Sequence, residues 1–334
     1  MVAIGTRATL RVSQARTYRP AVALAAGTVA LVAAGWALHW GGASFDASST
    51  ALRSVLAGPA TLVLLGVFLV VERVWPAQER PLVARGHKQD LLYTVVNATV
   101  LVPLVTALTL SFVAVVREVA PWVVLPRMGW LPRTAAIVAL LVLMDACNWY
   151  VHLLNHKVRG LWRFHELHHS QEDMNTLTVF RTHPLIHFSY LLAVIPGIVL
   201  LANGDLSITV LAAYGAMVAF AHSNTRLGFG PLERIFVSPN FHRIHHLRDG
   251  PQDVNLGFTL TIWDQLAGRA VFPTPATVRA ATGLPGRPLV VEQEGDRPHH
   301  LRVFAQQLLA PFRPMHEATD LPPARDRMAA RGGS

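Results

Sequence analysis

Residues 134–156, TAAIVALLVLMDACNWYVHLLNH, carry the two features that decide the fold of this chain. A long apolar run forms the first part, and Asp145 is the single charged side chain within it. The run ends in His152-x-x-x-His156, a spacing that places both imidazoles on one face of a helix, about one turn apart. We therefore expect a membrane helix whose inner end presents two histidines that can share a metal ion.

The same apolar character recurs along the chain. Of its 334 residues, 52% are hydrophobic and 15% are charged, which excludes a disordered protein, a collagen-like fibre and an ordinary soluble enzyme. Two of the apolar stretches are short and flank Asn203-Gly204-Asp205, which predicts a tight helical hairpin. The six candidate membrane elements are residues 21–38, 54–71, 91–116, 134–154, 188–201 and 206–221.

These elements predict the fold class. We expect an all-α integral membrane helical bundle with about four spanning helices plus the short helical hairpin. The histidine-rich segments would form a cytoplasmic helical cap on this bundle. A soluble protein with buried core helices is the alternative, but consecutive charge-free runs of this length are rare in soluble domains.

Basic residues predict the orientation in the membrane. Four arginines precede the first apolar stretch, whose length favours a retained signal anchor over a cleaved signal peptide. Before His222, twelve basic residues fall on the side of the N-terminus and four on the other side, so the N-terminus and the histidine-rich cap should be cytoplasmic. Only two of the 29 basic residues are lysine, which favours a GC-rich genome and hence a bacterial cytoplasmic membrane. Topology thus explains the net charge of +9 without a nucleic-acid partner.

The chain divides into four predicted segments. The last one contains apolar residues at helical spacing between 301 and 312, which predicts an amphipathic helix on the membrane surface, followed by a disordered tail. The lone Cys147 excludes a disulfide framework or a thiolate metal cluster confined to this chain. The segments are a basic cytoplasmic arm (1–20), N-terminal transmembrane helices (21–129), a histidine-rich catalytic domain (130–271) and a cytoplasmic C-terminal extension (272–334).

Eleven of the 16 histidines fall between residues 152 and 246, and nine of them are candidate ligands: eight in three spaced motifs, and His222 at the end of the sixth apolar stretch. Besides the HxxxH pair, an H-x-x-H-H triplet occurs twice. Its first and third histidines are i, i+4 neighbours on a helix, whereas the middle one lies three residues after the first and directly before the third, so one triplet can supply two adjacent ions. The predicted metal ligands are His152, His156, His165, His168, His169, His222, His242, His245 and His246.

The types of ligand limit which metals this site can bind. Nine imidazoles without cysteine suit Fe, Zn or Cu, and nine ligands exceed the four that a single structural zinc needs, which indicates two metals. Glu166 is the only carboxylate at ligand spacing within the triplets, and it should point away from its neighbouring histidines. An all-nitrogen dinuclear site fits activation of O₂ better than activation of water. A metal-binding or metal-transport membrane protein is the alternative, although a transporter would place polar ligands along several spans.

Two polar residues are candidates for catalytic support. A carboxylate within a membrane span is costly, so we expect Asp145 to accept the free ring N–H of a metal-bound histidine and fix its orientation. A helix–helix hydrogen bond is the alternative. Asn224, two residues after His222, could contribute an oxygen or a contact to a ligand, or could cap the helix.

Five motifs and a Trp-Asp pair together resemble the fatty acid hydroxylase/sterol desaturase superfamily, over about residues 130–270. The resemblance implies a membrane-bound non-haem di-iron oxygenase, which uses O₂ and external electrons to hydroxylate or desaturate an unactivated C–H bond of a lipid. It also implies that the nine histidines bind two iron ions. The motifs are Asp145–His156, Leu161–Ser170, Arg181–Pro184, His222–Asn224 and Pro239–His246, and the pair is Trp263-Asp264.

The resemblance leaves several details open. A fused cytochrome segment is missing from the sequence, so we expect a separate electron donor, either a ferredoxin or a cytochrome b5-like protein with its reductase. Sterols, fatty acyl chains, alkylglycerols and carotenoids are all processed by related proteins, so the substrate stays undetermined. His187 stands where many relatives have an acidic residue, and the roles of His183 and His187 also stay open.

Overall fold

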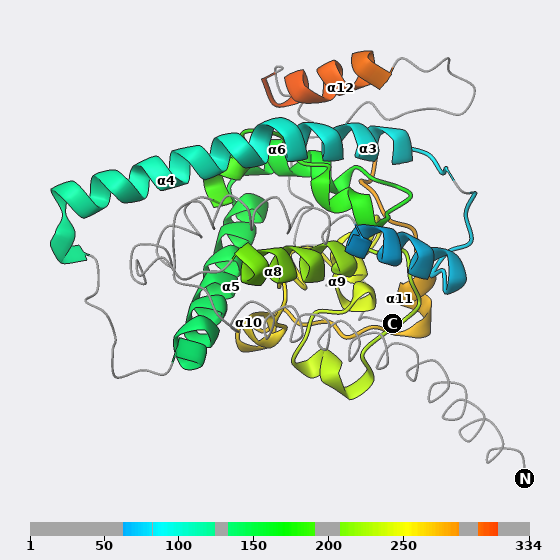
Figure 1. The fold of residues 1–334 in the computed structure, drawn as a ribbon. Helices are drawn as coiled ribbons and strands as arrows, with labels where there is room; N and C mark the ends of the chain where they lie inside the picture. The colour runs from blue at the N-terminus through cyan, green and yellow to red at the C-terminus, as the bar shows by residue number, and fades with distance from the viewer. Residues whose placement is uncertain (1–62, 82, 124–132, 191–207, 287–299, 313–334) are drawn as a thin grey trace, which may run out of the picture.

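The computed structural model describes residues 63–81, 83–123, 133–190, 208–286 and 300–312. Within these ranges every extended regular element is a helix, and the only β pairings are three isolated bridges. The all-α part of the prediction is therefore confirmed for the described residues (Figure 1). The basic arm, the first apolar stretch, the turn of the predicted hairpin and the C-terminal tail lie outside them.

No helix among the described residues combines enough length with enough apolarity to cross a membrane. The spanning bundle therefore stays a prediction. Residues 63–74 are helical, and so is most of the third and fourth apolar stretches. Of the two arms predicted for the hairpin, α8 (Ile208–Ala221) is described, whereas most of the other arm is not.

One long helical rod lies along one side of the molecule. It consists of α3 (His87–Val96), a π-helical turn (Asn97–Leu101) and α4 (Val102–Val119), which Figure 1 shows running on from one another. The π turn ends two residues before Pro103, which has no N–H to donate to the preceding turn. The rod therefore continues through the proline with an altered hydrogen-bond pattern.

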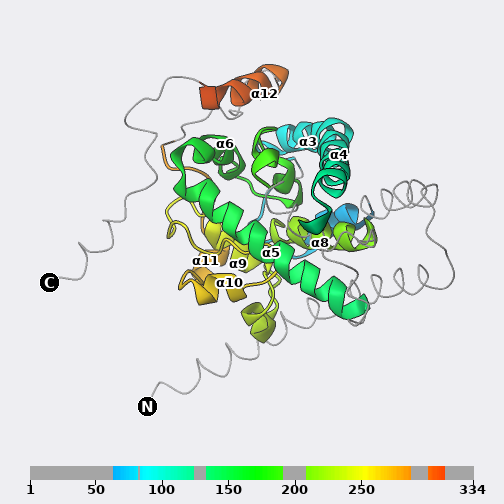
Figure 2. The same ribbon diagram turned by 90° about the vertical axis from the view of Figure 1, so that its left-hand side faces the viewer.

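The histidine motifs lie on three further helices. The 25-residue α5 (Arg133–Lys157) carries the HxxxH pair at its end, and Figure 2 shows it crossing in front of the other helices. Val158 is extended and turns the chain into α6 (Arg159–His169), which carries the first triplet. The first two histidines of the second triplet lie on the short α9 (Pro239–His245), and His246 directly follows this helix. Ser238 caps α9 by accepting from the N–H of Phe241.

A buried ion pair joins the rod to the chain that follows α6. Arg181 Nε lies 2.5 Å from Asp90 Oδ1, and both side chains are almost completely buried. Asp90 also accepts hydrogen bonds from the side chains of Gln171 and Asn175. Because its partners flank the 3₁₀ turn Thr176–Phe180, this network fixes where α6 ends relative to α3.

The last helix among the described residues packs on the protein, so it does not present its whole apolar face to a membrane. Helix α12 (His300–Leu309), followed by a 3₁₀ turn (Ala310–Phe312), lies over α3 in Figure 1. Phe304 and Leu308 pack against Tyr93 and Leu167, and Tyr93 donates a hydrogen bond to the buried Gln307. The amphipathic helix was predicted from the spacing of Leu301, Phe304, Leu308 and Phe312, and of these only Leu301 and Phe312 are exposed.

Short helices complete the part of the chain below the rod in Figure 1. They are η4 (Gly230–Arg234), α10 (Ile262–Leu266) and α11 (Pro275–Arg279). An isolated bridge joins Phe236 to Leu260, and a second joins Leu247 to Thr282. These bridges join the chain on either side of α9 to the segment before α10 and to the segment after α11.

Candidate metal centre

All nine candidate histidines, eight from the three motifs plus His222, are buried, and they form two clusters. Within each cluster the candidate ligand atoms lie within 4.8 Å of one another. Neither cluster includes a carboxylate from the described residues. Cluster A contains His152, His156, His165, His169 and His245, and cluster B contains His168, His222, His242 and His246.

The two triplets contribute to the clusters in opposite ways. The i, i+4 pair of the first triplet, His165 and His169, lies in cluster A, and its middle histidine lies in cluster B. The second triplet reverses this arrangement, because His242 and His246 lie in cluster B and His245 lies in cluster A. Each triplet therefore bridges the two clusters, as the spacing of its side chains predicts.

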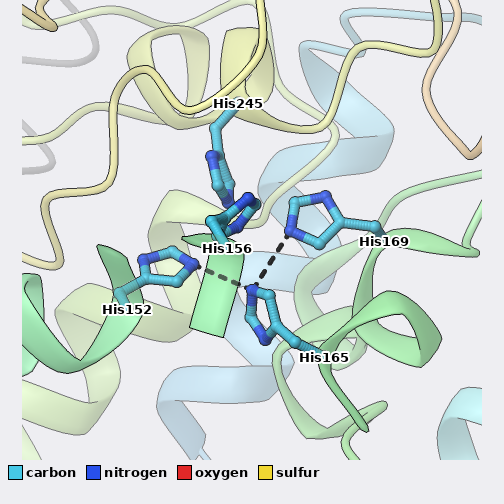
Figure 3. A group of neighbouring side chains, drawn as sticks. All are labelled: His152, His156, His165, His169 and His245. Carbon is cyan, nitrogen blue, oxygen red and sulfur yellow. Dashed lines mark hydrogen bonds between the residues drawn. The ribbon is translucent and has the colours of Figure 1, made fainter. Parts of the chain in front are cut away.

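Ring nitrogens converge in cluster A, as Figure 3 shows. Nε2 of His165 lies 3.0 Å from Nε2 of His152 and 3.2 Å from Nε2 of His169. Helices α5 and α6 supply four of the five side chains, and the short α9 supplies His245. The five rings thus surround one point where three helices meet.

Cluster B has the same internal spacing. Nε2 of His222 lies 3.0 Å from Nε2 of His168 and 3.1 Å from Nε2 of His242. Nε2 of His242 lies 3.2 Å from Nε2 of His246. Because His222 directly follows α8, this cluster joins α8 to α6 and α9.

The two clusters adjoin. The rings of His169 in cluster A and His246 in cluster B are stacked, with centroids 4.4 Å apart and planes inclined by 21°. His168 lies at a centroid distance of 5.4 Å from His165 and 5.5 Å from His169. Two ions held by these side chains would therefore be neighbours within one buried site.

A single loop orients three histidines of cluster A. The carbonyl oxygen of Leu256 lies 2.8 Å from Nδ1 of His152, and that of Val254 lies 3.0 Å from Nδ1 of His245. Since a carbonyl can only accept, both Nδ1 atoms carry the proton, which leaves the Nε2 lone pairs directed into the cluster. The carboxylate of Asp253 lies 3.6 Å from Nδ1 of His156.

The loop has a conformation that few residues tolerate. Asp253 and Asn255 have positive φ angles of 57° and 54°, in the left-handed region that Asp and Asn adopt more readily than most residues. The amide of Asn255 donates to the carbonyls of Phe241 and Val271, which anchors the loop to α9 and to the chain after α10. The carbonyls of Val254 and Leu256 are held against the histidines as a result.

Fewer hydrogen bonds orient the histidines of cluster B. The carbonyl of Val218, one turn earlier in α8, accepts the Nδ1 proton of His222 at 2.8 Å. Nδ1 of His242 is buried and has no hydrogen-bond partner. The orientation of cluster B thus depends more on the packing of α6, α8 and α9 than on a dedicated loop.

Burial keeps these imidazoles neutral. It lowers the pKa of His222 to about 4, and it lowers the pKa values of His165, His168 and His242 well below the ordinary value for histidine. Burial also lowers the pKa of His156, although Asp253 opposes the shift. Neutral imidazoles have the free lone pairs that metal binding requires.

The spacing and the unsatisfied nitrogens fit metal ions. A metal–imidazole bond is about 2.0–2.1 Å long, so ligand nitrogens around one ion lie roughly 3 Å apart, as the Nε2 atoms do in both clusters. Nε2 of His156 and of His245 are buried without a hydrogen-bond partner, which is costly unless a metal ion binds them. The all-nitrogen donor set suits Fe, Zn or Cu.

Asp145 does not contact a ligand histidine, so the prediction for its role is wrong. Its carboxylate accepts from the backbone N–H groups of Thr259 and Leu260 and from the side chains of Tyr214, Thr259 and Trp263. Seven residues of helix separate it from His152 by roughly 10 Å along the axis, beyond the reach of a carboxylate. Asp145 instead fixes the chain around α10 against α5.

Asn224 also lies outside the ligand set. Its amide nitrogen donates to the carbonyl of Gln78 at 2.8 Å, and its side-chain oxygen accepts from the N–H of Gln78 at 3.2 Å. The prediction that it supports a metal ligand is therefore wrong, since both ends of the side chain are bound to the segment after residue 74.

His183 and His187 are in neither cluster. Nε2 of His183 donates to the carbonyl of Leu308, and its Nδ1 accepts from the N–H of Leu185, so both ring nitrogens are engaged. Nε2 of His187 lies 3.2 Å from the hydroxyl of Thr182. His183 thus packs against α12 and the turn that follows it, whereas His187 contacts its own segment.

The residues that orient the ligand histidines were not predicted from the sequence. Asp253 and Asn255 carry no metal-ligand spacing, and they follow the second triplet in a loop. Asp264 accepts from the N–H groups of Leu256 and Gly257, which fixes the end of the same loop. Clustered Asp, Asn and Gly residues shortly after a histidine triplet were the available signal, because such residues favour turns with unusual backbone angles.

Comparisons with known proteins support the resemblance. Residues 137–269, less than half of the chain, match the family model for fatty acid hydroxylases. The chain is 36% identical over 145 residues to an ornithine lipid hydroxylase, OlsE, of Rhizobium tropici, covering 41% of this chain and 42% of that protein. It is 32% identical over 132 residues to an alkylglycerol monooxygenase of Homo sapiens, covering 37% of this chain and 28% of that protein.

The matched part spans less than half the length of these curated relatives. No match is found among solved structures. The resemblance to the fatty acid hydroxylase/sterol desaturase superfamily, inferred from the histidine motifs, is confirmed. All nine histidines lie inside the matched residues.

Proposed function

We propose that this protein is a membrane-bound, di-iron, O₂-dependent oxygenase that hydroxylates an unactivated C–H bond of a lipid. The observation that carries the proposal is the pair of adjoining, buried, all-histidine clusters. Relatives named as a lipid hydroxylase and as alkylglycerol monooxygenases support the reaction type. Desaturation of the same kind of bond is the closely related alternative.

In the proposed hydroxylation one oxygen atom of O₂ enters the C–H bond and the other leaves as water. Two electrons are supplied by a separate donor protein, and two protons by solvent. Bound iron would supply the reduction of O₂ that makes an unactivated C–H bond reactive. The nine histidines would hold the two ions, and the carbonyls of Val254 and Leu256 would keep two of the rings in a single tautomer.

Exposed apolar side chains support a membrane location. On the helical residues 63–74 they recur at Val63, Val67, Val70 and Val74, which lie on one helical face. On α4 a second row of exposed apolar residues has the same spacing, and it consists of Leu104, Leu108, Phe112, Val115 and Val119. Such rows suit contact with lipid. We propose that the protein lies in a bacterial cytoplasmic membrane, with the clusters on its cytoplasmic side.

Metal analysis combined with isotope labelling tests the proposal. We expect purified protein to contain iron, and we expect lipids from cells grown under ¹⁸O₂ to gain one ¹⁸O atom when the protein is present. A product that loses two hydrogens without gaining ¹⁸O would identify desaturation. Lipid mass spectrometry of the host with and without the protein would identify the substrate.

Variants connect the product to the clusters. His168→Ala in cluster B and His245→Ala in cluster A should both abolish product formation. His187→Ala, which removes a histidine outside both clusters, is the matched control and should keep activity. Iron-free wild-type protein, or full activity in His168→Ala and His245→Ala, would contradict the proposal. Iron that is bound without any O₂-dependent product would instead favour the metal-binding alternative.

A further inference from the structure

A cavity of about 550 Å³ lies outside the histidine clusters and has no role in the proposed chemistry. Its lining changes character from one side to the other. Leu69, Val83 and Leu91 line it and are exposed, whereas Asn175 and Asn224 line it and are buried. The cavity therefore extends from an apolar part of the surface to a polar interior.

The buried side of the cavity is close to cluster B in the chain. Asn224 is two residues after His222, and its N–H donates to Oε1 of Glu72, another lining residue. Ser223 lies between His222 and Asn224 in the sequence, and its hydroxyl is 2.8 Å from that of Thr176. A molecule that fills the cavity would thus contact Asn224 and Glu72, which belong to a polar network that begins at the residue after the candidate ligand His222.

The charges that line the cavity favour an anion. Arg80 pairs with Asp173, at 3.1 Å, and Oε1 of Glu72 accepts from the N–H and the hydroxyl of Thr176. These two internal charges are thus engaged by the protein. Two exposed cations remain, Lys88 and Arg73, whose guanidinium also donates to the carbonyl of Arg80, and the exposed carboxylate of Glu79 opposes them. The accessible lining therefore carries a net positive charge.

The position in the chain matches the level of lipid headgroups. The second predicted membrane stretch ends at residue 71 and the third begins at residue 91, and most of the residues that line the cavity fall between them. Basic residues in such a position lie where anionic headgroups meet water on the cytoplasmic side. The apolar lining next to them would accept the first part of an acyl chain.

We propose that this cavity binds the headgroup of the lipid substrate, and that this headgroup carries an anionic phosphate or carboxylate group. Arg73 and Lys88 would pair with the anion. Binding of a lipid headgroup here rests on the proposed function, because that function requires a lipid substrate. A headgroup held here would contact Asn224, which is two residues after His222 of cluster B.

Lipid binding, measured without turnover, tests the proposal. Full-length protein in an uncharged detergent would be titrated calorimetrically with dihexanoyl phosphatidylglycerol, with dihexanoylglycerol as an uncharged lipid, and with inorganic phosphate. We expect the wild type to bind the anionic lipid about fivefold more tightly than the neutral one, the scale of one or two exposed ion pairs. We expect inorganic phosphate to bind far more weakly than the anionic lipid.

Two variants with opposite expected effects sharpen the test. The double variant Arg73→Gln/Lys88→Gln should lose the preference for the anionic lipid, and Glu79→Gln should increase it. Arg302→Gln, which removes an exposed cation of α12 outside the cavity, should leave the preference unchanged. Iron content, measured on every variant, would confirm that the clusters are intact.

Three outcomes would overturn the headgroup proposal. They are equal binding of both lipids by the wild type, an unchanged preference in the double variant, and inorganic phosphate that binds as tightly as the anionic lipid. Any of them in a protein that still makes the O₂-dependent product leaves the proposed function standing. Conversely, a charge preference that depends on Arg73 and Lys88 in an inactive protein would show that the proposed function alone had failed.

Discussion

Clusters A and B are built from the same triplet motif, yet they are supported differently. Cluster A has five histidines, and the loop that contains Asp253 and Asn255 contacts three of them. Cluster B has four, and its His222 is oriented by a carbonyl of its own helix. Nδ1 of His242 has no partner at all. The ligands of cluster A are therefore more firmly positioned before a metal binds.

This difference has a chemical consequence. Hydrogen bonds to the second ring nitrogen fix the tautomer of a ligand and raise its basicity, so we expect cluster A to bind its metal more tightly. Cluster B has fewer nitrogen ligands, which would leave more room for O₂ or substrate at its metal. The cavity proposed for the headgroup also lies on the side of cluster B, through Asn224.

Removing one ligand from each cluster should give the largest effect. His242→Ala leaves three histidines in cluster B, whereas His245→Ala leaves four in cluster A, the number with which cluster B begins. We expect activity to fall at least about 100-fold in both variants, with His242→Ala losing more iron. Iron analysis and turnover of the two variants, with His187→Ala as control, check this. Greater iron loss from His245→Ala would reverse the comparison.

Disturbing the loop should affect cluster A selectively. Asn255→Ala removes the hydrogen bonds that anchor the loop and replaces a residue with a φ of 54°. We expect metal affinity at cluster A to fall about 10- to 100-fold, the usual cost of losing the support of ligands. Competition with a chelator would measure the affinity of each site.

Asn255→Gly provides the matched control for the loop. Glycine tolerates the left-handed conformation, so this variant loses the side-chain hydrogen bonds alone and should bind metal better than Asn255→Ala. Equal metal release from both clusters in Asn255→Ala would contradict a selective role of the loop.

Removing the metal should lower the stability moderately. Ions that bind only the folded chain stabilise it by mass action, by about 2.7 kcal/mol at a free concentration 100 times the Kd. Chelation should therefore lower the Tm by several degrees, and re-addition of iron should restore it. Scanning calorimetry of wild type, His242→Ala and Asn255→Ala would show which cluster dominates. An unchanged Tm after verified removal of iron would contradict the coupling of binding to folding.

Neutralising Asp145 should give a smaller effect, on stability rather than on metal content. Asp145→Asn keeps the shape, but its amide group cannot accept all the hydrogen bonds from Thr259, Leu260 and Trp263. We expect a loss of about 1–3 kcal/mol in the free energy of unfolding, with both irons retained. Urea denaturation and iron analysis check this. A variant that loses iron while keeping its stability would restore the role first predicted for this carboxylate.

Much of the site could be predicted from the sequence. Helical spacing of the triplets predicts that one triplet serves two clusters, because its second and third histidines are adjacent in sequence and therefore rotated by about 100° from one another around the helix. The roles of Asp145 and Asn224 could not be predicted in this way. Asp145 shares a helical face with His152 but lies two turns away, and its partners around Thr259 come from a distant part of the chain.

The fold was predictable to a similar extent. Apolar runs predicted helices, and the described residues are helical where α4, α5 and α8 were expected. The contacts of α12 were not predictable, because the spacing of Phe304 and Leu308 shows one apolar face without showing what covers it. Tyr93 and Leu167, which cover it, lie far away in the sequence.

Iron stoichiometry, combined with X-ray absorption at the iron edge, would show whether the nine buried histidines hold two neighbouring metal ions in clusters A and B. We predict two irons per chain with nitrogen ligands at about 2.0–2.2 Å, a second iron visible as a neighbour, and a single iron remaining in His242→Ala. One iron or none in the wild type, or two irons retained in both His242→Ala and His245→Ala, would contradict the two-cluster centre.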